Sequence, residues 1–376
     1  MTRPKTDRVF AFGALLLIAG VWIVSAVRLQ ADLMPIVRRT VPDAGHIVKQ
    51  NDGLFSAWAD ESETALIARI AIGTADGYGG PLQVAVAVDS SGTLIGAVVA
   101  DEKETPAWME RVRKSGLVPG LIGKTCGDEF KIGEDVDGVT GATYTARALA
   151  EAAATGSRAV AEILGLPVEA LKPPKIVFGI PEIALILLFA IGFLGHQSKF
   201  PYTKQARWAS MIIGLIVLGF IYNSPLTLAY ITKLVLGYWP QWQTNLYWYF
   251  LIGGILFVFT VDNKNPYCQW CCPFGAAQEC MGVIGGAKSR TPRQFHTLLI
   301  WLQRFLALVA ILLGVWLRNP GVAGFELFGT LFDLIGSSVQ FAALGLVLIA
   351  ALFIKRPWCN YLCPIRPIVD LIRLLR

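Results

Sequence analysis

Six apolar stretches recur along the chain, each close to the roughly 20 residues that a helix needs to cross a bilayer. The third contains Pro225, which should kink or end its helix. The first shows no clear small-x-small cleavage pattern, so we expect it to be retained as an anchor. The pattern therefore predicts an all-α membrane domain of six transmembrane helices. The stretches are Val9–Val27, Ile176–Gly195, Trp208–Leu236, Leu246–Val261, Leu298–Leu317 and Val339–Ile354.

The long segment between the first two stretches has the mixed pattern of an α+β domain. Leu82–Val88 and Thr93–Val99 are β-rich on either side of a turn, which predicts a hairpin. Helical patterns cover Trp108–Leu117 and Thr145–Leu164. We therefore predict three parts: an N-terminal anchor at 1–28, an extracytoplasmic α+β domain at 29–174, and a five-helix membrane domain at 175–376.

Composition and charge support the membrane interpretation and give an orientation. With 54% hydrophobic and 16% charged residues, the chain is not an ordinary cytosolic enzyme. One predicted face carries fifteen Lys and Arg residues in its short connections and ends, against only Arg318 in the short loops opposite. By the positive-inside rule we expect a multi-pass inner (cytoplasmic) membrane protein with both termini cytoplasmic and 29–174 periplasmic or extracellular. The net charge is +6, and the basic residues flank apolar segments. This arrangement predicts contact with membrane lipid and no nucleic-acid partner.

A run of small residues, Asp137-Gly-Val-Thr-Gly-Ala-Thr143, stands directly before the alanine-rich helix. Such residues let the backbone approach a ligand closely, and the free N–H groups at a helix start attract an anion such as a phosphate. The same run is also compatible with an Asp-Gly turn and a helix cap that bind nothing. These residues alone leave the second interpretation ahead.

The run resembles the flavinylation motif of the FMN-binding domain in NqrC- and RnfG-type redox subunits. The resemblance implies a phosphothreonyl FMN, covalently bound at Thr143. It also implies that a flavin transferase recognises the other motif residues, which are Asp137, Thr140, Gly141 and Ala142.

Two further runs, in the expected order, are similar to that family. They are Gly77-Tyr-Gly-Gly-Pro81 and Glu104-Thr-Pro106. The family usually continues the second with glycine-leucine-glycine, where this chain has Ala107-Trp-Met109. The resemblance implies additional cofactor-binding residues at Tyr78, Gly79, Gly80, Glu104 and Thr105.

Six of the seven cysteines fall at predicted cytoplasmic helix ends, where thiols stay reduced. Residues 266–273 and 357–364 align without a gap as Pro-aromatic-Cys-x-aromatic-x-Cys-Pro, which indicates a parallel repeat. Four thiolates could converge to hold an iron–sulfur cluster (4Fe-4S) or a closed zinc site. The alternative is that these cysteines are buried residues at helix ends that bind no metal. Cys126 stands alone outside the membrane and is predicted to be a buried apolar residue. The candidate ligands are Cys268, Cys272, Cys359 and Cys363, with Cys271 and Cys280 as extra candidates.

The membrane half resembles that of NosR-like proteins and of flavoproteins encoded with reductive dehalogenases, which join an FMN domain to a multi-span region with two C-x-x-x-C-P runs. NosR itself continues into a soluble module with two clusters. Because this sequence stops at Arg376, we expect it to be closer to the short, dehalogenase-associated form.

Four polar residues lie near predicted helix ends or within the spans. His196 and His296 could frame a haem or quinone site, although interface histidines more often bind water. Glu182 and Arg304 could transfer protons or bind quinone. Alternatively, their long side chains could extend so that the charged groups lie at the membrane interface.

Together these features suggest an electron-transfer component and not a stand-alone enzyme. The hypothesis is that electrons from the quinone pool, or from a cytoplasmic donor, pass through a Cys-ligated metal centre to covalent FMN. The flavin would then reduce an extracytoplasmic acceptor, either a respiratory reductase or a protein under maturation. A membrane redox sensor and a reductive maturation factor without steady electron flow remain open alternatives. Transport is less favoured because paired intramembrane charges are not evident.

Overall fold

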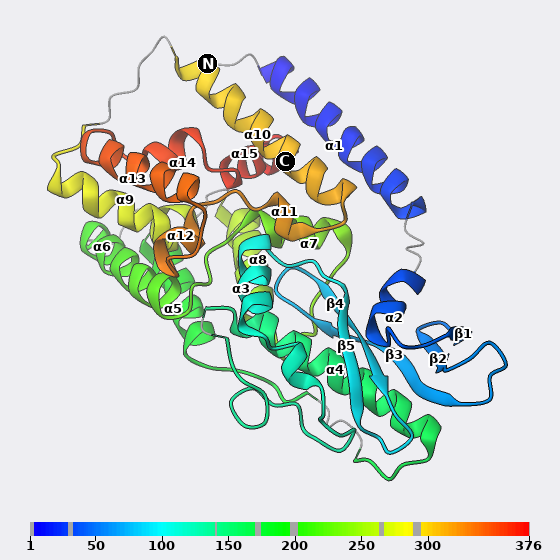
Figure 1. The fold of residues 1–376 in the computed structure, drawn as a ribbon. Coiled ribbons are helices and arrows are strands. Elements are labelled where there is room, and N and C mark those ends of the chain that lie inside the picture. The colour runs from blue at the N-terminus through cyan, green and yellow to red at the C-terminus, as the bar shows by residue number, and fades with distance from the viewer. Residues whose placement is uncertain are drawn as a thin grey trace.

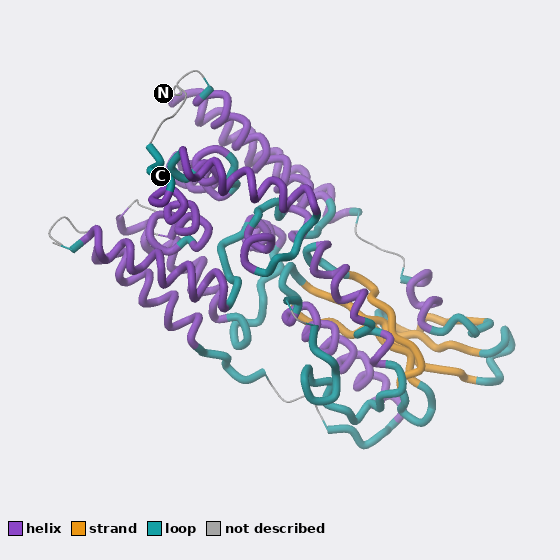
Figure 2. Tube along the Cα trace, turned by 60° about the vertical axis from the view of Figure 1, so that its left-hand side comes forward, coloured by secondary structure: helices purple, strands orange, loops and turns teal. Residues whose placement is uncertain are grey.

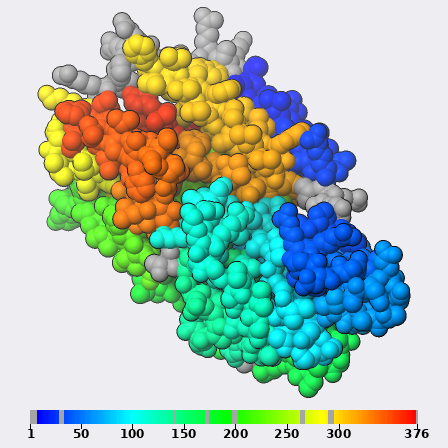
Figure 3. Space-filling view, viewed as in Figure 1, coloured from blue at the N-terminus to red at the C-terminus, as the bar shows by residue number. Residues whose placement is uncertain are grey.

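A computed structural model places an α+β domain against one end of a helical region (Figures 1 and 2). It describes residues 4–28, 33–139, 141–169, 174–195, 202–262, 267–288 and 295–375. In the space-filling view the α+β domain forms a continuous surface with the later helices (Figure 3).

The α+β domain is built on one antiparallel sheet whose five strands follow chain order, β1-β2-β3-β4-β5. From Val84 to Val88 strand β4 is an unbroken apolar run, and both faces of this part are buried. The hairpin predicted in this region is confirmed as β4 paired with β5. The strands are β1 (His46–Asn51), β2 (Leu54–Trp58), β3 (Leu66–Asp76), β4 (Pro81–Val88) and β5 (Leu94–Asp101).

Helices cover both faces of this sheet. Helix α4 (Thr143–Leu164) lies over β3 and β4 on one face, and α2 (Met34–Thr40) packs on the other. The alanine-rich face of α4 approaches β3 so closely that a Cβ on Gly73 would lie 1.9 Å from the Ala152 carbonyl oxygen. This close packing fixes the start of α4 relative to the sheet.

Both helices predicted in this domain and the burial of Cys126 are also confirmed. Helix α3 spans Pro106–Ser115 and is followed by a short 3₁₀ turn, η1 (Pro119–Leu121). Cys126 is 2% exposed, and its thiol donates to the Ser157 carbonyl at 3.2 Å.

All six predicted apolar stretches contain helix. Three are long and apolar enough to cross a membrane: Asp7–Val27, Thr203–Ile221 and His296–Trp316. Three shorter apolar helices cover Ile180–Gly195, Leu246–Val261 and Ser338–Phe353. The count of six spans stays a prediction. In the part of the chain that the structure describes, five helices of the helical region come before the first cysteine run and lie outside the repeat described below: α1 (Pro4–Val27), α5 (Ile180–Gly195), α6 (Thr203–Ile213), η2 (Gly214–Ile221) and α7 (Leu228–Leu236). Three more lie between the two copies of the repeat: α10 (His296–Trp316), α11 (Pro320–Ala323) and α12 (Phe328–Phe332).

The third predicted stretch is broken into two helices. The π-helix η2 ends at Ile221, residues 222–227 are not helical, and α7 begins at Leu228. Pro225 lies inside the break, as its missing N–H and fixed ring predict. The break turns the chain toward the α+β domain.

The two cysteine runs belong to a structural repeat. Its first copy is α8 (Leu246–Asp262), η3 (Tyr267–Cys271) and α9 (Pro273–Ile284), and its second is α13 (Ser338–Phe353), α14 (Pro357–Tyr361) and α15 (Ile365–Leu375). Equivalent backbone bonds occur in both, from Cys272 N–H to the Tyr267 carbonyl at 2.7 Å and from Cys363 N–H to the Trp358 carbonyl at 2.8 Å.

Helices of each copy of the repeat pack against helices of the other copy. Helix α9 packs on α13 of the other copy, whereas the Arg373 guanidinium of α15 lies 5.8 Å from the ring centroid of Phe259 in α8. This reciprocal packing brings the two cysteine runs face to face.

Candidate functional site

The start of α4 opens into a cavity of about 330 Å³ between the α+β domain and the broken helix. Gly141 and Thr143 line one side, and Tyr222, Asn223 and Ser224 of the break line another. Protein ligand sites usually occupy about 300–1,000 Å³, so the space suits a cofactor-sized molecule. Thr143 is the first residue of α4, where we expected an anion-attracting helix end.

A basic side chain lies beside the phosphate position that the motif implies. A Cβ added to Gly141 would lie 2.8 Å from Nη1 of Arg111, so this guanidinium packs directly over the loop before Thr143. Together with the N–H groups at the start of α4 it provides positive charge for a phosphate. Sequence reasoning missed Arg111, since only the tertiary fold brings α3 next to this loop.

Three aromatic rings form the other wall. The Tyr78 ring contacts Trp108 at a centroid distance of 5.3 Å and Tyr230 at 5.2 Å. Tyr78 was predicted from the family motif, whereas Trp108 stands where this chain departs from that motif. Aromatic faces of this kind suit a flat heterocycle such as a flavin.

The run that begins at Glu104 holds the run that contains Tyr78 in place. Both carboxylate oxygens of buried Glu104 accept hydrogen bonds, from Gly79 N–H at 3.1 Å and from the Thr145 hydroxyl at 2.6 Å. Burial raises the pKa of the Glu104 carboxyl. A Cβ on Gly79 would lie 1.7 Å from the Lys103 carbonyl oxygen, so this position requires glycine. Glu104 and Gly79 thus fix the loop that carries Tyr78.

The remaining predicted residues lie around the cavity rather than in it. Gly80 packs near Tyr238 and Thr105 lines a smaller adjacent pocket of about 60 Å³. Ala142 lines the main cavity, and the Asp137 side chain is exposed. Thr140 lies outside the described residues.

A lysine from the membrane half holds the Tyr78 loop. Lys233 of α7 is 4% exposed, and its ammonium donates to the carbonyls of Gly77 at 3.0 Å and Tyr78 at 3.1 Å. The Tyr78 hydroxyl lies 3.4 Å from that of Thr227, just before α7. The membrane half therefore forms part of the cavity, a contact for which no local sequence signal exists.

The four predicted cysteine ligands gather between the two repeats. Cys363 lies close enough to Cys268, Cys272 and Cys359 to interact with each electrostatically. Among the described residues, no three His, Cys, Asp or Glu side chains are placed to hold one metal ion. Four neighbouring thiols make up the complete ligand set of a 4Fe-4S cluster.

Comparisons with known proteins agree with both sites. Residues 77–156 match the model of the FMN-binding domain, and residues 244–292 and 338–376 match that of a 4Fe-4S binding domain. The protein NirI of Paracoccus denitrificans is 27% identical over 213 residues, which are 50% of this chain and 30% of NirI. The regulatory protein NosR of Pseudomonas aeruginosa is 27% identical over 201 residues, 48% of this chain and 28% of NosR. The two domain matches and these relatives make the chain similar to NosR-like flavoproteins.

A third relative is similar to a shorter part of the chain. It is a component of the ion-translocating oxidoreductase complex of Salmonella typhi, 34% identical over 119 residues, which are 29% of this chain and 57% of that component. The chain thus spans between 28% and 57% of the length of these three relatives. The family domains support FMN and an iron–sulfur cluster as cofactors, and the helices support a place in the inner membrane.

Polar side chains surround the four candidate ligand cysteines. The Gln278 amide donates to Sγ of Cys359 at 3.3 Å, and that of Gln303 donates to the Cys363 carbonyl at 2.8 Å. Arg356, whose φ of +48° is unusual for a residue other than glycine, donates to the Cys268 carbonyl at 2.8 Å. Its cation would offset the negative charge of thiolates bound to iron.

The two extra candidate ligands have different surroundings. Cys271 is fully buried, and its carbonyl oxygen packs against Gly214, where an added Cβ would lie 2.5 Å away. Cys280 lies further along α9, partly exposed and beside Glu279.

The flavin cavity and the cysteine cluster are close neighbours. Gly214 contacts Cys271, and Ile221 lines the cavity seven residues later on the same helix. A more direct link joins Leu226 N–H to the Tyr267 hydroxyl at 2.7 Å, one residue before Cys268.

Proposed function

We propose that this chain carries electrons between an iron–sulfur cluster at Cys268, Cys272, Cys359 and Cys363 and an FMN esterified to the Thr143 hydroxyl. The main support is the hydrogen bond from Leu226 to Tyr267, which joins the helix break beside the cavity to the first cysteine run. Electron transfer through protein weakens steeply with distance, so two redox centres this close form one path.

The side chains around the cavity have separate tasks in this proposal. Arg111 and the start of α4 hold the phosphate next to Thr143. Tyr78 and Trp108 provide the aromatic surface for the flavin ring. FMN, when bound, supplies the ability to exchange one or two electrons. The phosphoester keeps the cofactor from being lost to dilution outside the cell.

The donor, the acceptor and the topology are also part of the proposal. A flavin transferase attaches FMN on the outer side of a six-span protein whose termini are cytoplasmic. A quinol or a cytoplasmic donor reduces the cluster, and FMN passes the electrons to an extracytoplasmic reductase. The relative from an ion-translocating oxidoreductase complex supports an electron-transfer role.

Anaerobic redox titration of the purified protein in nanodiscs tests the path. Dithionite or a reduced viologen should reduce the cluster, seen by electron paramagnetic resonance, and the FMN, seen by absorbance. In a Cys359→Ser/Cys363→Ser variant, reduction of FMN by a viologen that reacts at the cluster should slow by about tenfold or more. Equal FMN reduction rates in variant and parent protein would refute a route through the cysteines.

A redox sensor is the second candidate, favoured by one contact. Lys233 joins the Tyr78 loop to α7, so a change in flavin charge reaches a membrane helix directly. Two relatives carry the name regulatory protein NosR. Steady flavin turnover with an external acceptor favours the electron carrier, whereas a single reduction followed by altered protease sensitivity of the cytoplasmic loops favours the sensor.

A further inference from the structure

A polar chamber of about 260 Å³ lies between α10 and α15, away from the flavin. Its lining includes His296, Gln303 and Arg304 of α10, together with Arg366 and Asp370 of α15. His296 and Arg366 are exposed, so the chamber is reached from the surface at the start of α10.

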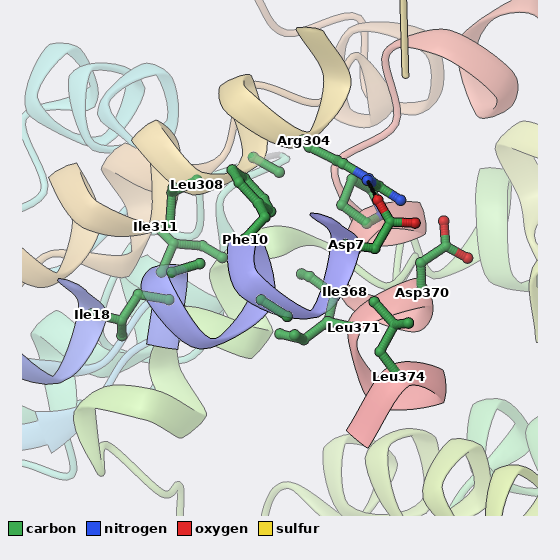
Figure 4. A pocket seen from close by; sticks show the side chains of 14 residues that line it. Asp7, Phe10, Ile18, Arg304, Leu308, Ile311, Ile368, Asp370, Leu371 and Leu374 are labelled. Atoms are coloured by element: carbon green, nitrogen blue, oxygen red, sulfur yellow. Dashed lines mark hydrogen bonds and ion pairs between the residues drawn. The ribbon is translucent and has the colours of Figure 1, made fainter. Parts of the chain in front are cut away.

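An apolar groove continues from this chamber between α1, α10 and α15 (Figure 4). The chamber and the groove share Arg304, Pro367 and Asp370. Figure 4 shows Asp7, Arg304 and Asp370 at one end of the groove, while Ile18 and Ile311 lie toward the other end. One polar end and one long apolar path thus meet at a single junction.

The junction is held by a largely buried ion pair. Arg304 Nη1 lies 2.8 Å from Asp7 Oδ1, and the two side chains are 11% and 12% exposed. The Arg304 guanidinium also lies 5.0 Å from the ring centroid of Trp301. Ionised groups in a membrane helix are costly and usually mark a functional position.

The chamber is next to the cysteine cluster. Gln303, which lines it, donates to the carbonyls of Cys363 at 2.8 Å and Cys359 at 3.5 Å. Arg366, on the opposite wall, follows Cys363 by three residues. A molecule bound in the chamber would therefore be one side chain away from two predicted ligands of the cluster.

We propose that this chamber and groove bind an isoprenoid quinol, with its ring at Arg304 and its tail along α1. The inference rests on the proposed electron path and names the donor that enters it. A quinol has one small polar ring, which suits the polar chamber, and one apolar chain, which suits the apolar groove. A phospholipid would bring two chains and a phosphate to the same junction.

Quinol oxidation at this site balances as follows. The bound quinol releases two electrons and two protons and leaves as the quinone. An iron–sulfur cluster held by the four cysteines would be the immediate oxidant and would supply the ability to take these electrons one at a time. One proton goes to the imidazole of His296 and one to the carboxylate of Asp370. Both are then released to solvent, because His296 is exposed and Asp370 is partly exposed.

Photolabelling measures binding without requiring activity. The protein in nanodiscs is illuminated with an azido-quinone, and labelled peptides are identified by mass spectrometry. We expect label on α10 and α15, lost with excess decyl-ubiquinone or menadione and retained with excess cardiolipin. Label spread evenly over the lipid-facing helices, or displaced by cardiolipin alone, would overturn the proposal.

Two variants and one matched control locate the label. Ala14→Phe fills the groove and should lower labelling by about tenfold, because added bulk in a packed site excludes the ligand. Gly13→Phe adds the same ring where no atom lies within 4 Å, and labelling should persist. Arg304→Gln should lower labelling without adding bulk. Equal labelling of all three variants would contradict the site.

The same samples separate this proposal from the electron path. Ala14→Phe should lose quinol-driven FMN reduction but retain reduction by a viologen. Viologen-driven reduction without any specific label would reject the quinol site and leave the path intact. Specific label with no flow from cluster to FMN would reject the path and leave the site intact.

Discussion

The backbone N–H of Leu226 donates to the phenolic oxygen of Tyr267 at 2.7 Å. This bond exists because Pro225 ends the regular helix and leaves the next N–H without a helical partner. Tyr267 supplies that partner from the segment that carries Cys268. The helix break and the cysteine run therefore form one structural unit between the flavin cavity and the cluster.

Replacing Tyr267 with Phe should weaken this unit. The buried Leu226 N–H would lose its acceptor, at a cost of about 1–3 kcal/mol in the free energy of unfolding. Electron transfer from cluster to FMN should slow several-fold in stopped-flow absorbance. The control is Tyr249→Phe, which removes a hydroxyl that donates to the Pro240 carbonyl. If both variants behave alike, the Tyr267 link has no special part in the path.

Thr143→Ala should abolish covalent flavin. The hydroxyl at the first residue of α4 is the proposed ester oxygen, so intact mass should fall by one FMN relative to the parent protein. Thr155→Ala, on the same helix, removes a hydroxyl that bonds only locally to Glu151 and should keep the flavin. An unchanged mass in Thr143→Ala would place the attachment elsewhere.

Cys359→Ser should lower iron and acid-labile sulfide together. Cys359 accepts a hydrogen bond from Gln278 inside the group of four thiols, so its loss removes one predicted ligand of the cluster. Cys126→Ser changes a thiol in the α+β domain and should leave both contents unchanged. Zinc without sulfide in the parent protein would show that the thiols hold a structural metal instead.

Local sequence patterns predicted much of this molecule. The apolar runs, the hairpin and the helix start at Thr143 depend on neighbours in sequence, and the cysteine repeat is visible as a constant spacing of 91 residues. These features are determined by periodicity and turn chemistry, which a single sequence records.

Contacts between distant segments could not be predicted in the same way. Arg111 reaches the flavin cavity, and Lys233 reaches the loop of Tyr78 across 155 residues. Neither residue lies in a motif, because a guanidinium or ammonium on an ordinary helix gives no local signal of its partner. The closeness of the two redox sites also depends on how η3 folds back against η2.

Lys233→Met should loosen the flavin loop while preserving the fold of each half. The carbonyls of Gly77 and Tyr78 would each lose a charged donor, which destabilises their docking by about 1–3 kcal/mol. Flavin fluorescence should rise and its absorbance bands should shift, since Tyr78 no longer holds its position. Lys204→Met, at an exposed position of α6, is the matched control. Identical flavin spectra in both variants would contradict a positioning role for Lys233.

Stability should decrease as pH rises toward neutrality, because of Glu326. Burial raises the pKa of this carboxyl, which accepts a hydrogen bond from Leu228 N–H, to about 7. Between its ordinary pKa and about 7 the folded protein keeps a proton that the unfolded chain has released. The free energy of unfolding should therefore fall by about 1 kcal/mol per pH unit in this window and level off above it.

Thermal melts from pH 5 to 8 in detergent measure this dependence. Glu326→Gln mimics the protonated carboxyl, so its melting temperature should change less with pH than that of the parent protein. Glu110→Gln removes an exposed carboxylate paired with Lys114 on α3 and should keep the parental slope. A parental slope in Glu326→Gln would assign the pH dependence to another group, and the pocket beside Tyr78 would then hold Glu326 ionised throughout the range.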